Sequence, residues 1–153
     1  MNTRALAGAA LLTMAAGLGC SARADGPPRI EEDRTACSHC GMLVSERMYA
    51  AAYRAPGHEA RVFDDIACLG QAARAERDGA ALTFWFHDAR TREWIDGRRA
   101  TFVHAPGLNT PMAGGMLAYG DDAAAGEAAA DHRGRVIGGL DQLLAESPTA
   151  GGS

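Results

Sequence analysis

The chain has 153 residues, with 15 basic and 19 acidic side chains, and its formal net charge is −4 at pH 7. Every basic residue apart from histidine is an arginine, and the arginines form no basic patch, which argues against a nucleic-acid partner. The acidic balance instead suits an exported soluble domain and modestly favours the collection of cations.

Residues 1–19 are predicted to be a secretory signal peptide. Arg4 precedes an apolar run from Ala5 to Gly19 that is too short and too rich in small residues to span a membrane. Two cleavage sites compete after it: one before Cys20, which would then be lipidated, and an A-x-A site ending at Ala24. We favour lipidation, because Cys20 is otherwise unexplained and closes the apolar run. Either site predicts a protein on the periplasmic side of a bacterial membrane.

The rest of the chain is predicted to form a tether, one domain and a tail. Residues 20–34 are polar, contain two adjacent prolines and are typical of a flexible tether. Residues 35–146 are enough to bury one hydrophobic core. Residues 147–153, "SPTAGGS", are typical of a loose C-terminal tail.

The first half of the domain, about residues 42–90, contains patterns for three strands and a helix. Strands are expected over 47–55 and 59–65, because aromatic and β-branched residues flank the turn signal "PGH". A helix is expected over 66–79, with apolar residues near one face, an aspartate cap before it and a glycine at its end. The apolar run at 81–89 then predicts the third strand.

The second half, about residues 94–146, repeats this order. Strands are expected over 98–106 and 113–120, followed by an alanine-rich helix over 121–134 and a further stretch over 135–144 that ends in a short helix. The order strand, strand, helix, strand therefore occurs twice. This repetition predicts an α+β domain built from two small homologous ββαβ units.

The sequence C-x-x-C-G-M at 37–42 lies in a loop before the first strand, and four chemistries compete for it. A structural zinc site needs four ligands, yet Cys68 is the only further cysteine of the domain. A redox pair usually opens a helix, and no helix is expected here. A disulfide between Cys37 and Cys40 suits an oxidising compartment, although so short a loop removes little unfolded-state entropy.

A soft metal ion is the fourth possibility, and Met42 favours it. Thiolate and thioether sulfurs are soft donors that select Cu(I) over harder ions. Cys40 and Met42 are two residues apart across Gly41, so both side chains can point to one side of an extended backbone. We therefore predict a Cu(I) site at Cys40 and Met42, with Cys37 beside it as a further candidate ligand.

A second methionine can complete a low-coordinate site. Met112 follows a proline in the glycine-rich turn "NTPMAGGM" at 109–116, and we favour a role as ligand for it. Met48 and Met116 lie inside expected strands, where a methionine usually fills gaps in the core.

The other polar candidates stay open or have a structural explanation. His39, inside the cysteine pair, is either a third donor or a solvated loop residue, and His104 at a strand end is also a candidate. Cys68 is expected to be a buried thiol on a helix. Asp64 and Asp65 could suggest acid–base catalysis, but capping of the helix explains Asp65 without it.

Three blocks in this order resemble the NosL family, the accessory lipoproteins of nitrous oxide reductase: "CSHCGM" at 37–42, "FDDIACL" at 63–69 and "TPMAGG" at 110–115. The resemblance covers about residues 35–145. It implies a periplasm-facing copper(I) chaperone whose two ββαβ units resemble the organomercurial lyase fold. It also implies that Cys40, Met42 and Met112 are copper ligands and that a lipid anchor holds the protein to the membrane.

We therefore expect a non-enzymatic protein that binds Cu(I) and delivers it to membrane-bound assembly machinery or to nitrous oxide reductase itself. One rival is a thiol-dependent enzyme, either an oxidoreductase or an organomercurial lyase, that uses Cys37, Cys40 or Cys68 as nucleophile. Another is an anchored interaction domain that a disulfide stabilises without any metal.

Overall fold

The computed structural model describes residues 26–76 and 81–146. The expected signal peptide at 1–19, the expected lipidation site Cys20 and the expected tail at 147–153 lie outside the described residues. Within the described ranges, no helix combines the length and the apolar character needed to cross a bilayer.

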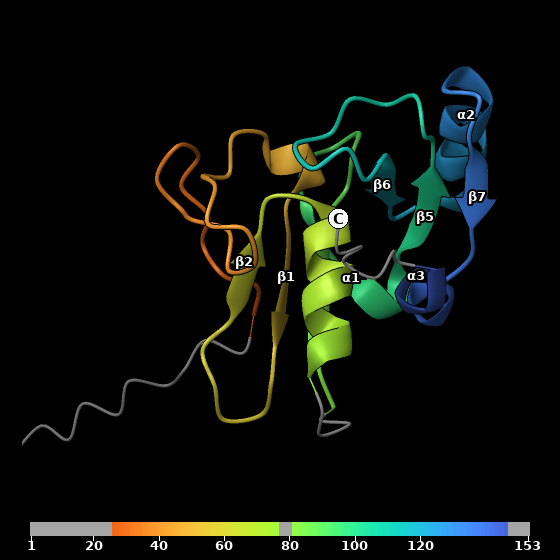
Figure 1. The fold of residues 1–153 in the computed structure, drawn as a ribbon. Coiled ribbons are helices and arrows are strands. Elements are labelled where there is room, and N and C mark those ends of the chain that lie inside the picture. Colours follow the sequence, from red (N-terminus) through yellow and green to blue (C-terminus); the bar gives the residue numbers. More distant parts are fainter. Residues whose placement is uncertain (1–25, 77–80, 147–153) are drawn as a thin grey trace, which may run out of the picture.

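The helices and strands form two successive groups (Figure 1). The first group consists of η1 (Arg47–Tyr49), β1 (Ala51–Arg54), β2 (Arg61–Phe63), α1 (Ile66–Ala75), β3 (Thr83–His87) and β4 (Trp94–Asp96). The second group consists of η2 (Gly97–Arg99), β5 (Thr101–His104), β6 (Met116–Tyr119), α2 (Asp122–Asp131), β7 (Arg135–Ile137) and α3 (Leu140–Glu146).

Each group places its first strand in the middle of an antiparallel sheet. β1 pairs with β2 on one side and with β3 on the other, and β4 extends the sheet beyond β3. In the same way, β5 lies between β6 and β7. The structure thus confirms the predicted α+β fold and the ββαβ order of both halves.

One hydrophobic core joins the two sheets. The rings of Phe86 in β3 and Phe102 in β5 meet edge to face, with centroids 4.7 Å apart, and Ile66 of α1 belongs to the same buried cluster. α1 packs on β1 and β2 and also contacts α3 and β6, so it lies between the two halves (Figure 1). Burial of large aromatic rings across this boundary makes the halves parts of one packed unit.

The structure differs from the prediction at η1, at β4, and at η2, which takes the first residues of the strand expected over 98–106. The expected strand over 47–55 starts at Ala51, because the three residues of η1 form a 3-10 turn instead. β4 was not predicted, because three residues are too few to show the alternation that marks a strand. The backbone N–H of Arg98 donates to the Asp96 carboxylate at 2.9 Å, so Asp96 ends β4 and caps η2.

Residues 26–34 lie against the domain, although the sequence predicts a flexible tether there. Ile30 is buried in a small cluster with Val44, Ala50 and Val62. Burial of one isoleucine side chain contributes on the order of 2 kcal/mol, which offsets the entropy cost of ordering only one or two residues, so the polar contacts of the segment must contribute as well. An apolar residue within a polar segment was the sequence signal for this contact.

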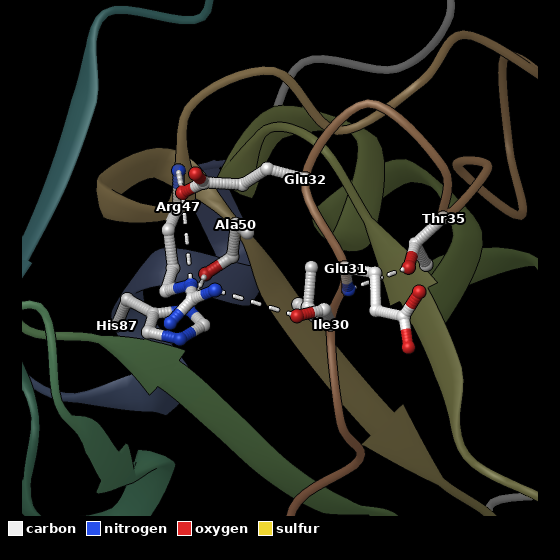
Figure 2. Close-up of polar contacts among 7 residues, drawn as sticks. All are labelled: Ile30, Glu31, Glu32, Thr35, Arg47, Ala50 and His87. Carbon is white, nitrogen blue, oxygen red and sulfur yellow. Dashed lines mark hydrogen bonds and ion pairs between the residues drawn. The ribbon is translucent and has the colours of Figure 1, made fainter.

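Polar contacts hold the same segment on η1 (Figure 2). The Arg47 guanidinium donates to the carbonyl of Ile30 at 3.4 Å, and its backbone N–H donates to the Glu32 carboxylate at 3.2 Å. The backbone N–H of Glu31 donates to the hydroxyl of Thr35 at 2.9 Å. Contacts with the domain therefore begin before residue 35, several residues closer to Cys20 than predicted.

Candidate metal centre

The C-x-x-C-G-M motif forms the tip of a small hairpin. The Cys37 N–H donates to the carbonyl of Met42 at 2.7 Å, and the Gly41 N–H donates to the carbonyl of Cys37 at 3.0 Å. Gly41 has a φ of 79°, in the left-handed region where glycine is unstrained. The hairpin is fixed to β2 by the Ser38 N–H, which donates to the carbonyl of Val62 at 2.7 Å. Both cysteines are thus held beside the end of β2.

Two further residues complete a cluster with this cysteine pair. Asp64 follows β2, and Cys68 lies in the first turn of α1. The sulfurs of Cys37, Cys40 and Cys68 and a carboxylate oxygen of Asp64 all lie within 4.8 Å of one another. All three cysteines are free thiols. This is a donor set of three soft sulfurs and one oxygen around a single point.

Access to the cluster is one-sided. Cys37, Cys68 and Asp64 are buried, with 3% or less of their surface exposed, whereas Cys40 is only half-buried. An ion from solvent or from a partner protein therefore meets Cys40 first. The buried thiols lie behind it.

Burial and mutual hydrogen bonding shift the protonation of the cluster. The Cys68 thiol donates to Cys37 and lowers the pKa of Cys37, with help from the backbone N–H groups of Cys40 and Asp64. The same contact with Cys37, together with burial, raises the pKa of Cys68 far above its ordinary range. Burial also raises the pKa of Cys40. Cys37 is thus the thiol that loses its proton first.

Asp64 has one carboxylate oxygen without a partner. Its Oδ1 accepts a hydrogen bond from the Cys40 thiol at 3.6 Å. Its Oδ2 is buried and has no hydrogen-bond partner among the described residues. Burial raises the pKa of Asp64 to about 6. A buried oxygen of this kind beside three thiols fits a site that receives a cation.

The structure places both predicted methionines at the same end of α1. Met42 follows Cys40 in the hairpin, and its side chain is 45% exposed. Met112 lies in the loop between β5 and β6, which reaches across to the N-terminus of α1 (Figure 1). There the backbone N–H of Met112 donates to Asp65 at 3.0 Å, and its side chain is 41% exposed. Both thioethers are thus exposed to solvent at this end of α1.

The other candidates have different environments. Nε2 of His39 lies 2.9 Å from the amide oxygen of Gln71 on α1, so His39 donates that proton and only Nδ1 could bind an ion. His104 ends β5 opposite Met116 and is not part of the cysteine and aspartate cluster. Met116 is buried in the core and Met48 packs on a second cluster of buried residues, as predicted.

Sequence reasoning missed the participation of Cys68 and Asp64. Cys68 is a buried thiol on α1, as expected, but it adjoins the cysteine pair. Asp64 precedes the N-cap Asp65, whose backbone is extended, so helical spacing does not relate its side chain to that of Cys68. The sequence carried no local signal that both residues adjoin residues 37–40, because that contact is tertiary.

Comparisons with known proteins find one matching family and a solved structure with a similar fold. The model of the NosL family matches residues 28–142. The crystal structure of the copper chaperone NosL from Shewanella denitrificans is similar, with a TM-score of 0.61 and 14% sequence identity. The similarity covers 72% of this chain and 90% of that chain. Comparison with curated proteins gives no match.

Proposed function

Because this chain belongs to the NosL family, we propose that it is a copper chaperone that binds Cu(I) and transfers it to a partner protein. The observation that carries the proposal is the cluster of Cys37, Cys40 and Cys68 at the N-terminus of α1, in which Cys40 is half-buried. Family membership favours a binding protein over a thiol-dependent enzyme.

The donor chemistry supports Cu(I) as the cargo. Thiolate and thioether sulfurs select Cu(I) over harder divalent ions. We propose Cys40, Met42 and Met112 as the accessible ligands and Cys37 as a further ligand, with Cys68 behind them. Cys40 must lose its thiol proton on loading, and Asp64 Oδ1 already accepts a hydrogen bond from that thiol.

Transfer would proceed by ligand exchange. A low-coordinate Cu(I) ion can accept a donor from a partner before it leaves its own ligands. The exposed sides of Met42 and Met112 leave room for such a donor, whereas the buried thiols do not. We propose that the thioethers are released first and Cys40 last, because thiolate is the stronger donor.

The assignment of a recipient protein and of a cellular location rests on the family resemblance. We propose that the recipient belongs to the maturation of nitrous oxide reductase, on the periplasmic side of a bacterial membrane. A tether from lipidated Cys20 would raise the local concentration of the chaperone near a membrane-bound partner without any new contact.

Replacing Met42 with isoleucine tests the site directly. The change keeps an apolar side chain but removes the sulfur, so we expect Cu(I) affinity to fall about tenfold, or roughly 1.4 kcal/mol. The side chain lies at the surface, so the unfolding free energy of the apo protein should change by less than about 0.5 kcal/mol. Anaerobic competition with a Cu(I) chelator measures the affinity, and urea denaturation measures the stability.

Met48→Leu is the matched control, because it removes a thioether that packs on a different cluster. It should leave Cu(I) affinity unchanged. An equal loss of affinity in both variants, or a large loss of apo stability in Met42→Ile, would contradict a role for Met42 as ligand.

Replacing Cys20 with serine tests the anchor. We expect the wild-type protein in the membrane fraction of the producing bacterium and the variant either soluble or uncleaved, because lipidation needs the cysteine. Fractionation and N-terminal sequencing give the answer. Wild-type protein that is soluble and begins at Asp25 would contradict lipidation and leave the copper site untouched.

A further inference from the structure

The carboxylate of Asp65 joins the two halves of the domain. Its Oδ1 accepts from the backbone N–H of Ala67 at 2.8 Å and caps α1. Its Oδ2 accepts from the Thr110 hydroxyl at 2.6 Å and from the backbone N–H of Met112 at 3.0 Å. Asp65 is fully buried. A single side chain thus holds the methionine loop of the second half on the helix of the first.

Capping alone does not need this arrangement. Asp121 occupies the same place in the second ββαβ half, and its Oδ1 caps α2 by accepting from Ala124 at 2.8 Å. Asp121 is exposed, and the described residues offer it no second side-chain contact. The contacts of Asp65 Oδ2 are therefore additional to the helix cap.

The loop that Asp65 holds is packed closely and has a defined shape. A Cβ atom added to Gly114 would lie 2.5 Å from the Cβ of Ala67 and 2.8 Å from Asp65 Oδ1, so only glycine fits there. Thr110 also accepts from the backbone N–H of Gly115 at 3.2 Å. The position of the Met112 backbone is thus determined by its contacts with the start of α1.

Asp65 is adjacent to Asp64, whose Oδ1 contacts the Cys40 thiol. One carboxylate of this pair therefore faces the thiols, while the other fixes the backbone of Met112. We propose that Asp65 is a positioning residue of the copper site, which holds the Met112 thioether on the side where Cys40 is accessible. This inference rests on the proposed function.

Replacing Asp65 with asparagine removes an acceptor but keeps the shape of the side chain. The amide has one oxygen, so either the cap or the contact with Thr110 and Met112 loses its acceptor. We expect Cu(I) affinity to fall about 10- to 100-fold, the range typical of residues that orient a metal ligand. Met112→Ile should have a similar effect. The double variant should bind no more weakly than Met112→Ile alone, because Asp65 acts through Met112.

Two further variants separate positioning from folding. Asp121→Asn weakens the equivalent cap of α2 and should leave Cu(I) affinity at the wild-type value. Thr110→Val removes one donor to Asp65 Oδ2 but leaves the α1 cap intact, and it should weaken Cu(I) binding in the same direction as Asp65→Asn. Anaerobic competition with a Cu(I) chelator, carried out on the full mature protein and its variants, measures all of these affinities.

The outcomes distinguish this inference from the proposed function. Wild-type affinity in Asp65→Asn and Thr110→Val, with tight binding by the wild type, would overturn the positioning role and leave the chaperone proposal standing. Fully additive losses from Asp65→Asn and Met112→Ile would also overturn it. Failure of the wild type to bind Cu(I) would overturn the proposed function itself.

Discussion

Replacing Cys40 with serine should abolish tight Cu(I) binding and leave the apo protein folded. Cys40 is the one half-buried thiol of the cluster, and its sulfur lies within 4.8 Å of the other donors. A hydroxyl is a hard donor that does not hold Cu(I), so we expect affinity to fall by at least about a hundredfold, the upper end of what loss of an orienting residue costs. The serine hydroxyl can still donate to Asp64, which preserves the apo contact. Anaerobic chelator competition and thermal melting of the apo protein measure the two effects.

Ser38→Ala is the control from the same hairpin. The Ser38 backbone contacts β2, but its side chain makes no hydrogen bond among the described residues. Its Cu(I) affinity should equal that of the wild type. Tight Cu(I) binding by Cys40→Ser would contradict the assignment of Cys40 and point to Cys37 and Cys68 as a self-sufficient pair.

His87 should destabilise the apo protein in acid, in opposition to Asp64, whose raised pKa stabilises the folded state over the same range. The His87 side chain is 2% exposed, and its ring lies tilted against that of Trp94 with centroids 3.7 Å apart. Its Nδ1 donates to the carbonyl of Ala50 at 3.2 Å (Figure 2). Burial lowers the pKa of His87 to about 4, whereas an unfolded histidine titrates near about 6.5. The unfolded state therefore binds more protons at this residue between these values, so the stability contributed by His87 falls as the pH drops from about 6.5 to about 4. The full loss attributable to His87 is about 3 kcal/mol.

His87→Phe isolates this contribution. Phenylalanine keeps a ring beside Trp94, and the carbonyl of Ala50 still accepts from the backbone N–H of residue 87 at 3.2 Å. Urea denaturation at pH 7, 6, 5 and 4 should show that the variant gains stability relative to the wild type as the pH falls. His58→Gln, which replaces an exposed histidine in a turn, should change with pH like the wild type. Parallel curves for wild type and His87→Phe would contradict a buried neutral His87.

Most of the fold was predictable because its signals are local. Asp65 caps α1 as expected, the alanine-rich helix α2 forms where predicted, and the apolar run around Phe86 forms the expected strand. β4 and the docking of Ile30 were missed because they depend on contacts with distant parts of the chain. A three-residue strand forms only where β3 offers a free edge, and Ile30 is buried only because Val44, Ala50 and Val62 form a surface for it.

Part of the candidate site was predictable because its signals are also local in the sequence. The spacing of Cys37, Cys40 and Met42 indicated a soft-metal loop, and the turn around Met112 indicated a second donor. The approach of Cys68 to the cysteine pair is a tertiary contact, so the helix pattern predicted its burial but not its neighbours. Asp65 was recognised as a helix cap, but its second carboxylate oxygen accepts a hydrogen bond from Thr110, 45 residues later in the chain.

Anaerobic titration of the wild-type mature protein with Cu(I), in competition with a chelator and then with Zn(II), tests the central claim most directly. Sulfur donors around Cys40 predict that about one Cu(I) ion binds tightly and that an equal concentration of Zn(II) does not displace it. Displacement of copper by zinc under those conditions, or no binding that survives the chelator, would contradict a Cu(I) chaperone.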